Sequence, residues 1–208
     1  MKLQMAVDNA DLNLALEYAR CTHDVLDIFE CGTPLLMREG VHVVRAIKEA
    51  YPDLTVLADS KIMDGGAVET TDICEAGADI VTVLALADDA TVQEVIDTCH
   101  QYGSLAMADL ICVTDIPARA RELVTMGIDL IAVHTGVDQQ AQGRTPLGDL
   151  KELVGAVDPA MAAVAGGINA TTVADYVALN PGVVIAGGAL YGAPDLRRAV
   201  IQMKGALV

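Results

Sequence analysis

A cluster of charged residues, Asp59-Ser60-Lys61-Ile62-Met63-Asp64, has the form DxKxxD and directly follows an apolar segment. Carboxylates this close together repel one another unless a lysine or a metal ion lies among them. A solvated salt bridge at the end of a strand would explain the same run, because charge near loops is common. However, Glu30 follows the preceding apolar segment, and Mg²⁺ is typically held by one or two carboxylates. We therefore expect Glu30 and Asp59 to be the ligands of a divalent cation.

Two more polar residues, Asp8 and His134, also come directly after apolar segments. A lone histidine is more often structural than catalytic, and this interpretation suits the other three, His23, His42 and His100, which lie between or within helical stretches. An imidazole exchanges protons near neutral pH. His134 is therefore a candidate general base, provided that the fold brings it to the acids.

The elements that must position these residues are visible as eight short apolar runs separated by helical patterns. The runs cover residues 3–7, 25–29, 55–58, 80–84, 105–108, 130–133, 162–165 and 183–186. They are apolar without alternation, which is typical of a parallel sheet covered on both faces. Between them, apolar residues recur at helical spacing, as in Leu12, Ala15, Leu16 and Ala19.

Eight strand–helix units in 208 residues leave about 26 residues per unit, enough for one strand, one helix and two short loops. This regularity predicts an α/β fold, a single TIM (β/α)8-barrel domain over residues 1–208. A doubly wound open sheet would usually show a GxGxxG turn after its first strand, whereas this chain has Asp8-Asn9-Ala10. In a barrel, all the polar residues named above would meet at the carboxyl ends of the strands.

Two glycine pairs follow the last two apolar runs, in Ala165-Gly166-Gly167 and Ala186-Gly187-Gly188. Either pair alone is explained by a tight turn into a helix. In a barrel, however, the loops after strands 7 and 8 commonly bind phosphate through backbone N–H groups. The two pairs together predict a phosphate site.

The charge balance limits the partners of this protein. With 13 basic and 29 acidic residues, the formal net charge is −16, which repels nucleic acid and anionic membrane surfaces. No apolar run approaches the ~18 residues of a membrane span, and the first residues lack a signal-peptide pattern. The five cysteines form no CxxC pair, as expected of reduced core thiols. We therefore expect a cytoplasmic protein without nucleic-acid or membrane partners.

Five motifs recur together in one group of proteins. They are Asp8 after the first strand, Glu30-Cys31-Gly32-Thr33-Pro34, the run from Leu57 to Asp64, Val133-His134-Thr135-Gly136, and the two Ala-Gly-Gly turns. In these motifs the chain resembles the orotidine monophosphate decarboxylase suprafamily, whose barrels are of the ribulose-phosphate-binding type. Within it, the pattern is similar to the 3-hexulose-6-phosphate synthase family. The resemblance spans nearly the whole chain.

The resemblance implies an aldehyde-lyase that joins D-ribulose 5-phosphate and formaldehyde, reversibly, into D-arabino-hex-3-ulose 6-phosphate. The reaction would pass through an enediolate stabilised by Mg²⁺, with Mn²⁺ as a possible substitute, bound through Glu30 and Asp59. It also implies a homodimer in which Asp64 completes the neighbouring subunit's site.

The resemblance assigns roles to the remaining site residues as well. Lys61 would hydrogen-bond a substrate oxygen, and His134 would lie near the carbon that loses its proton. Apart from the resemblance, we expect Asp8 to orient Lys61 rather than transfer a proton. The phosphate would meet the backbone around Gly166, Gly167, Gly187 and Gly188.

Alternatives remain open. The related 3-keto-L-gulonate-6-phosphate decarboxylases form the same kind of enediolate, but they typically carry arginines where this chain has Thr135-Gly136-Val137 and Ala186-Gly187-Gly188. Orotidine decarboxylation fits poorly, because the lysine-rich charge array of that group is incomplete here. A Schiff base on Lys61 is disfavoured because Asp59 and Asp64 should keep the ammonium charged. The alternative from another class is a non-catalytic barrel that binds a sugar phosphate.

Overall fold

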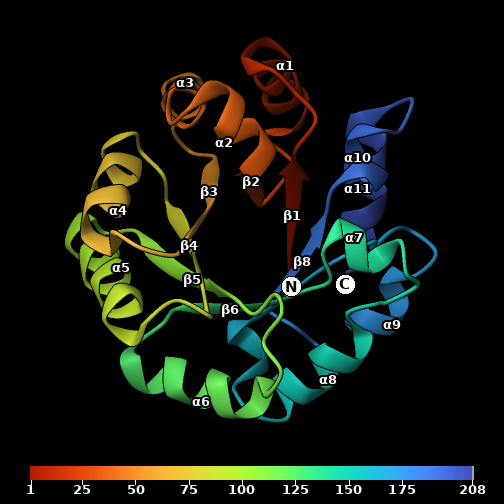
Figure 1. Cartoon of the computed structure of the whole chain (residues 1–208). Coiled ribbons are helices and arrows are strands. Elements are labelled where there is room, and N and C mark those ends of the chain that lie inside the picture. Colours follow the sequence, from red (N-terminus) through yellow and green to blue (C-terminus); the bar gives the residue numbers. More distant parts are fainter. Residues whose placement is uncertain (208) are drawn as a thin grey trace.

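Strand and helix alternate from end to end in the computed structural model, which describes residues 1–207 (Figure 1). The parallel strands follow one another around a closed barrel in chain order, and β8 pairs with β1. This confirms the predicted (β/α)8 barrel. The strands are β1 (Lys2–Val7), β2 (Ile28–Cys31), β3 (Thr55–Ile62), β4 (Ile80–Leu84), β5 (Leu105–Asp109), β6 (Leu130–His134), β7 (Ala162–Ala165) and β8 (Val183–Ala186).

Helices surround the barrel (Figure 1). They are α1 (Leu12–Thr22), α2 (Thr33–Glu39), α3 (His42–Ala50), α4 (Gly66–Glu75), α5 (Asp89–Tyr102), α6 (Ile116–Met126), α7 (Val137–Gln140), α8 (Leu147–Val154), the 3₁₀ turn η1 (Pro159–Met161), α9 (Val173–Val177), α10 (Gly188–Tyr191) and α11 (Leu196–Gly205). The connections after β2, β6 and β8 each hold two α-helices, where the pattern predicts one. Among residues 1–207, no helix has both the length and the apolar character needed to cross a bilayer.

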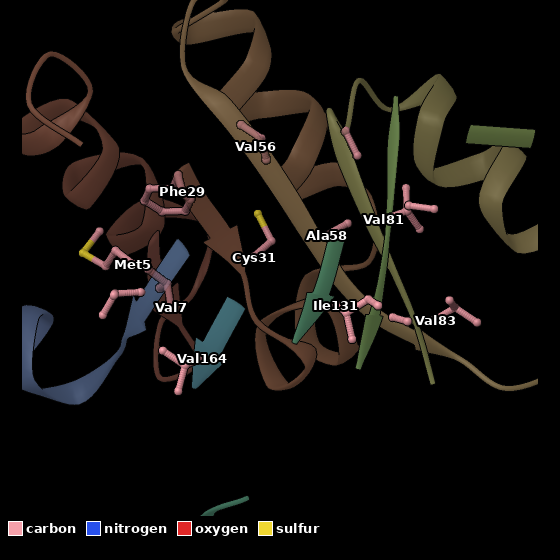
Figure 2. Close-up of a cluster of buried hydrophobic side chains, with 14 of the residues drawn as sticks. Met5, Val7, Phe29, Cys31, Val56, Ala58, Val81, Val83, Ile131 and Val164 are labelled. Atoms are coloured by element: carbon pink, nitrogen blue, oxygen red, sulfur yellow. The ribbon is translucent and has the colours of Figure 1, made fainter. Parts of the chain in front are cut away.

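The barrel wall separates two apolar clusters. Outward-facing side chains such as Met5, Phe29 and Val56 pack between the strands and the helices (Figure 2). Inside the barrel, a second cluster is formed by Ile28, Leu57, Ile80, Met107, Ala132, Ala163, Val183 and Ile185. Because strand side chains alternate between the two faces, burial on both explains why the runs show no polar alternation.

The inner cluster ends abruptly, and polar residues take its place. Two residues beyond their inner apolar positions, five consecutive strands carry Glu30, Asp59, Thr82, Asp109 and His134, and all five side chains line one cavity. The period of two along a strand keeps each of these side chains on the inner face. The inner apolar cluster therefore lies directly below five polar side chains at the carboxyl ends of β2 to β6.

The bounds of two strands, β2 and β3, differ from the prediction by more than one residue. The run at 25–29 begins too early, because the N–H groups of Val25 and Leu26 bond to the Thr22 carbonyl in a turn. The run at 55–58 ends too early, because β3 continues to Ile62 through a register shift against β4. The charged residues Asp59 and Lys61 interrupt the apolar pattern but remain in the strand, since the barrel interior is polar at that level.

The opposite end of the barrel repeats one arrangement three times. Asp27, Asp79 and Asp129 precede β2, β4 and β6, and each carboxylate accepts the N–H of the second residue of the strand before it, at 2.9, 2.7 and 2.8 Å. Each also contacts a side chain from an outer helix, namely Lys204, Lys48 and His100, at 2.7, 2.9 and 2.9 Å. We call these three aspartates the base clamps, because each joins two strands to a helix away from the cavity.

Candidate active site

One cavity of about 1000 Å³ lies at the carboxyl ends of the strands, the face on which barrel enzymes carry their active sites. It is lined by Asp8, Glu30, Asp59, Lys61, His134, Gly166, Gly167, Gly187 and Gly188. Four acids were expected at these strand ends, and three of them, Asp8, Glu30 and Asp59, line the cavity. Asp64 does not. It lies exposed in the loop after β3, where its carboxylate accepts the N–H of Gly65 at 2.8 Å, and it does not line the described cavity of its own chain.

Lys61 occupies the centre of the charged groups in a strained conformation. Its φ of 48° lies in the left-handed region, which costs a non-glycine residue about 1–3 kcal/mol and is characteristic of functional sites. Lys61 lies within the register shift of β3 against β4, and its N–H donates to Thr82 Oγ1 at 2.9 Å. Its side chain lines the cavity.

The ammonium group of Lys61 has three partners. It forms an ion pair with Asp59, lies 3.6 Å from Asp109 Oδ2, and donates to Thr33 Oγ1 at 3.2 Å. Burial by itself would lower the pKa of Lys61, but the charges of Asp59 and Asp109 outweigh burial and raise it. From the sequence, Asp59 and Asp64 are the acids expected to keep the ammonium charged. Asp109 takes the place of Asp64, and the lysine stays charged.

Glu30 and Asp59, on neighbouring strands, are held differently. Glu30 Oε2 accepts a hydrogen bond from Gln4 at 2.6 Å. Asp59 Oδ1 accepts one from Thr82 at 3.0 Å, while its Oδ2 accepts one from Thr33 at 2.8 Å. Burial, followed by the charge of Asp59, raises the pKa of Glu30 to about 8. Two neighbouring carboxylates provide oxygen ligands suited to a divalent cation, whose charge would favour the ionised form of Glu30.

His134 is oriented by a carboxylate that the sequence analysis missed. His134 Nδ1 lies 2.9 Å from Asp109 Oδ2. A carboxylate accepts hydrogen bonds, so Nδ1 carries the proton and a neutral ring leaves Nε2 as a base. Burial would raise the pKa of Asp109, but the hydrogen bond from His134 and the charges of His134 and Lys61 lower it. The sequence does contain a signal for this carboxylate, because Asp109 directly follows the apolar run at 105–108, as Asp59 follows the run at 55–58.

The two glycine turns lie on the same cavity. Gly166 and Gly167 have φ values of 128° and 68°, which side chains rarely tolerate. A Cβ on Gly166 would also come within 2.8 Å of the Thr135 carbonyl oxygen. Gly188 begins α10, directly after Gly187. The two glycine turns therefore form the cavity wall on the side of β7 and β8.

Asp8 has a different neighbour from the one expected. Among the described contacts, no hydrogen bond or ion pair joins Asp8 to Lys61, so the prediction that Asp8 orients the lysine directly is not supported. A Cβ on Gly32 would lie 2.1 Å from Asp8 Oδ1, so only glycine allows the start of α2 to pass this carboxylate. Burial, then the charge of Asp59, raises the pKa of Asp8. Asp8 thus adds a further acid to the cavity wall.

Known proteins resemble this chain along nearly its whole length. Residues 1–203 match the model of the Orotidine 5'-phosphate decarboxylase / HUMPS family. The chain belongs to this family. Membership in the Orotidine 5'-phosphate decarboxylase / HUMPS family confirms the resemblance drawn from the motifs at Asp8, Glu30 and Asp59.

Individual members of the family are similar along the whole chain. The chain is 39% identical over 208 residues to the 3-hexulose-6-phosphate synthase of Bacillus subtilis (strain 168), covering 100% of this chain and 99% of that protein. The solved 3-hexulose-6-phosphate synthase from Salmonella typhimurium is 47% identical with a TM-score of 0.96, covering 100% and 98%. A solved 3-keto-L-gulonate-6-phosphate decarboxylase from Vibrio cholerae O1 biovar El Tor is 25% identical with a TM-score of 0.87, covering 99% and 96%.

The sequence identities and TM-scores show which family members are more similar to this chain. The synthases exceed the Vibrio cholerae decarboxylase in both sequence identity and TM-score. The expected enzyme class, aldehyde-lyase, is therefore confirmed by full-length relatives that carry the synthase name.

Proposed function

We propose that this protein catalyses the reversible aldol condensation of D-ribulose 5-phosphate with formaldehyde to D-arabino-hex-3-ulose 6-phosphate. The observation that carries this proposal is the full-length similarity, at 39% and 47% identity, to proteins named 3-hexulose-6-phosphate synthase. The cavity contains groups suited to each part of the reaction: two glycine turns for the phosphate, a charged lysine, an oriented histidine and two paired carboxylates.

The charge of the cavity determines how an anionic substrate can bind. Five carboxylates line its described wall, those of Asp8, Glu30, Asp59, Asp109 and Asp138, against a single lysine, Lys61. A phosphate would be repelled from this side, so it would bind the backbone N–H groups of the two glycine turns. The reacting end of the sugar would then extend toward Lys61 and His134.

The same charge imbalance favours a divalent cation at Glu30 and Asp59. Mg²⁺ prefers oxygen ligands and is typically held by one or two carboxylates together with substrate oxygens, so this pair fits it, and Mn²⁺ would serve as a substitute. When bound, the cation would act as a Lewis acid that offsets negative charge on the substrate.

The protein's own groups would move the protons. His134 Nε2 would take the proton from C1, and the electron pair of the C–H bond would form the enediolate. The Lys61 ammonium would donate a hydrogen bond to an enediolate oxygen, a preorganised interaction whose strength increases as charge develops. The enediolate carbon would then attack formaldehyde, forming the new C–C bond, and the proton held by His134 would pass to the aldehyde oxygen.

We further propose a homodimer in which Asp64 completes the site of the partner. Asp64 is exposed on its own chain. Met63 beside it, Val68 in α4 and Met37 in α2 are exposed apolar side chains. Exposed apolar residues gather where chains associate. We also propose a cytoplasmic setting, because all five cysteines are free thiols and disulfide bonds are rare in the cytosol.

Product analysis would test the proposed reaction. Incubation of ribulose 5-phosphate with ¹³C-formaldehyde and MgCl₂ should give a ¹³C signal in a hexulose phosphate, followed by NMR. Lys61→Ala should remove this signal while its circular dichroism spectrum stays like that of the wild type. Release of CO₂ from 3-keto-L-gulonate 6-phosphate, without use of formaldehyde, would point to the decarboxylase instead. Phosphate binding with neither activity would point to a binding barrel.

A further inference from the structure

Gln4 is a polar side chain in an apolar part of the barrel. It lies on β1, is only 1% exposed, and is paired in register with Ile28 and Ile185 of the inner apolar cluster. A buried amide lacking a full set of partners costs about 1–3 kcal/mol. An aliphatic residue would suit this level of the barrel better, so the amide needs an explanation.

The amide makes one strong contact and leaves one atom without a partner. Gln4 Nε2 donates to Glu30 Oε2 at 2.6 Å. Gln4 Oε1, in contrast, is one of two buried side-chain oxygens or nitrogens without a hydrogen-bond partner in the described residues, the other being Thr70 Oγ1. In this position Gln4 provides a hydrogen bond to Glu30, while its own side-chain carbonyl oxygen is left without a hydrogen-bond donor.

The chemistry of the pair fixes its orientation. A carboxylate that binds a cation is ionised and only accepts hydrogen bonds, so in that state the nitrogen of the amide must face Glu30. This contact occupies Oε2, while Glu30 Oε1 has no hydrogen-bond partner among residues 1–207. Thr82, on the strand after β3, holds Asp59 in a comparable way at 3.0 Å. Each of the two carboxylates is thus fixed by a neutral side chain from an adjacent strand.

We propose that Gln4 is a positioning residue that holds Glu30 with one oxygen free to bind the divalent cation. This inference rests on the proposed function, since it presumes that Glu30 is a cation ligand. Groups that hydrogen-bond to metal ligands fix the ligand's orientation, and their loss typically weakens metal affinity by about 10–100-fold. Gln4, which lines the cavity beside Glu30, would accordingly affect cation binding through the position of the Glu30 carboxylate.

The test is a titration of the metal-free protein with MnCl₂, in which electron paramagnetic resonance reports free Mn²⁺. Gln4→Met keeps the length of the side chain but removes the donor, and should weaken Mn²⁺ binding by about 10–100-fold. Thr70→Val is the matched control, because it removes the other buried oxygen without a partner and should leave the affinity unchanged. Gln4→Asn retains an amide but shortens the chain by one methylene. It should give a similar loss, and it serves if the Met variant folds poorly.

The Glu30→Gln variant tests whether Glu30 binds the cation, separately from whether Gln4 positions Glu30. If it weakens Mn²⁺ binding strongly while Gln4→Met and Gln4→Asn remain within twofold of the wild type, the positioning role is refuted and the metal site stands. If Glu30→Gln has no effect, the assigned metal site fails, and the role of Gln4 fails with it. Equal losses in Gln4→Met and Thr70→Val would show a general effect of core substitution and would also refute the proposal.

Discussion

Single residues in this cavity are held by more than one partner, and Asp109 is the clearest case. Its Oδ2 contacts His134 at 2.9 Å and lies 3.6 Å from the Lys61 ammonium, while its Oδ1 accepts the N–H of Ile111 at 2.8 Å. One buried carboxylate thereby fixes both the proposed base and the proposed oxyanion partner. Loss of its charge should disturb both at once.

Asp109→Asn should make the free energy of unfolding less dependent on pH in the acid range. The pKa of Asp109 is lowered from its ordinary 3.8, so the carboxylate stabilises the fold above that pH, and the stability is lost as pH falls through the lower folded pKa. The Asn variant should be less stable by about 1.5–3 kcal/mol at pH 7, the size of a hydrogen bond to a charged group. Urea unfolding at a series of pH values measures the difference.

The difference between wild type and Asp109→Asn should shrink toward zero as the wild-type carboxyl protonates. Asp138→Asn is the control, because Asp138 is an exposed acid on the same cavity and its substitution should alter stability little at any pH. A difference that grows in acid would contradict the assigned sign.

At the level of elements, the apolar patterns were sufficient for the barrel but not for the details of the site. They located eight strands, because burial on both faces produces continuous apolar runs. They ended β3 too early, because Asp59 and Lys61 have charged side chains that point into a polar interior. The left-handed conformation of Lys61 and the orientation of His134 by Asp109 depend on packing between strands, which a single sequence does not encode in its local spacing.

The turn after β7 gives a prediction at this scale. Gly166→Ala should lower the free energy of unfolding by about 1–3 kcal/mol, the usual cost of an unfavourable backbone conformation. It should also weaken binding of inorganic phosphate, because the new Cβ would approach the Thr135 carbonyl and displace the turn. Thermal denaturation and calorimetric titration measure the two effects.

Gly148→Ala is the matched control for the glycine turn. Gly148 lies in α8, and a Cβ there would meet nothing within 4 Å, so alanine should stabilise the helix by up to about 1 kcal/mol. Unchanged phosphate binding in Gly166→Ala would remove this turn from the proposed phosphate site.

For the whole molecule, the proposed exchange of Asp64 between subunits has a consequence for mixed dimers. Lys61→Ala and Asp64→Ala should each be inactive alone. In a heterodimer of the two, one site would receive Lys61 from one chain and Asp64 from the other, and would be intact. Co-refolding equal amounts should restore about a quarter of the wild-type activity, because half of the dimers are mixed and each contains one intact site.

Two controls accompany this measurement. A mixture of Lys61→Ala and Asp59→Ala should stay inactive, because both residues line the cavity of one chain. Sedimentation of the wild type should give the mass of a dimer. A monomer, or the absence of recovery in the first mixture, would refute the shared site.

The base clamp at Asp27 connects the two ends of the chain. Its carboxylate accepts the N–H of Leu3 at 2.9 Å and contacts Lys204 at 2.7 Å, so the first strand and the last helix meet at one side chain on the side away from the cavity. A short linker could therefore join α11 to β1, with new ends cut in an exposed loop. Such a circular permutant should retain the barrel and an unobstructed mouth.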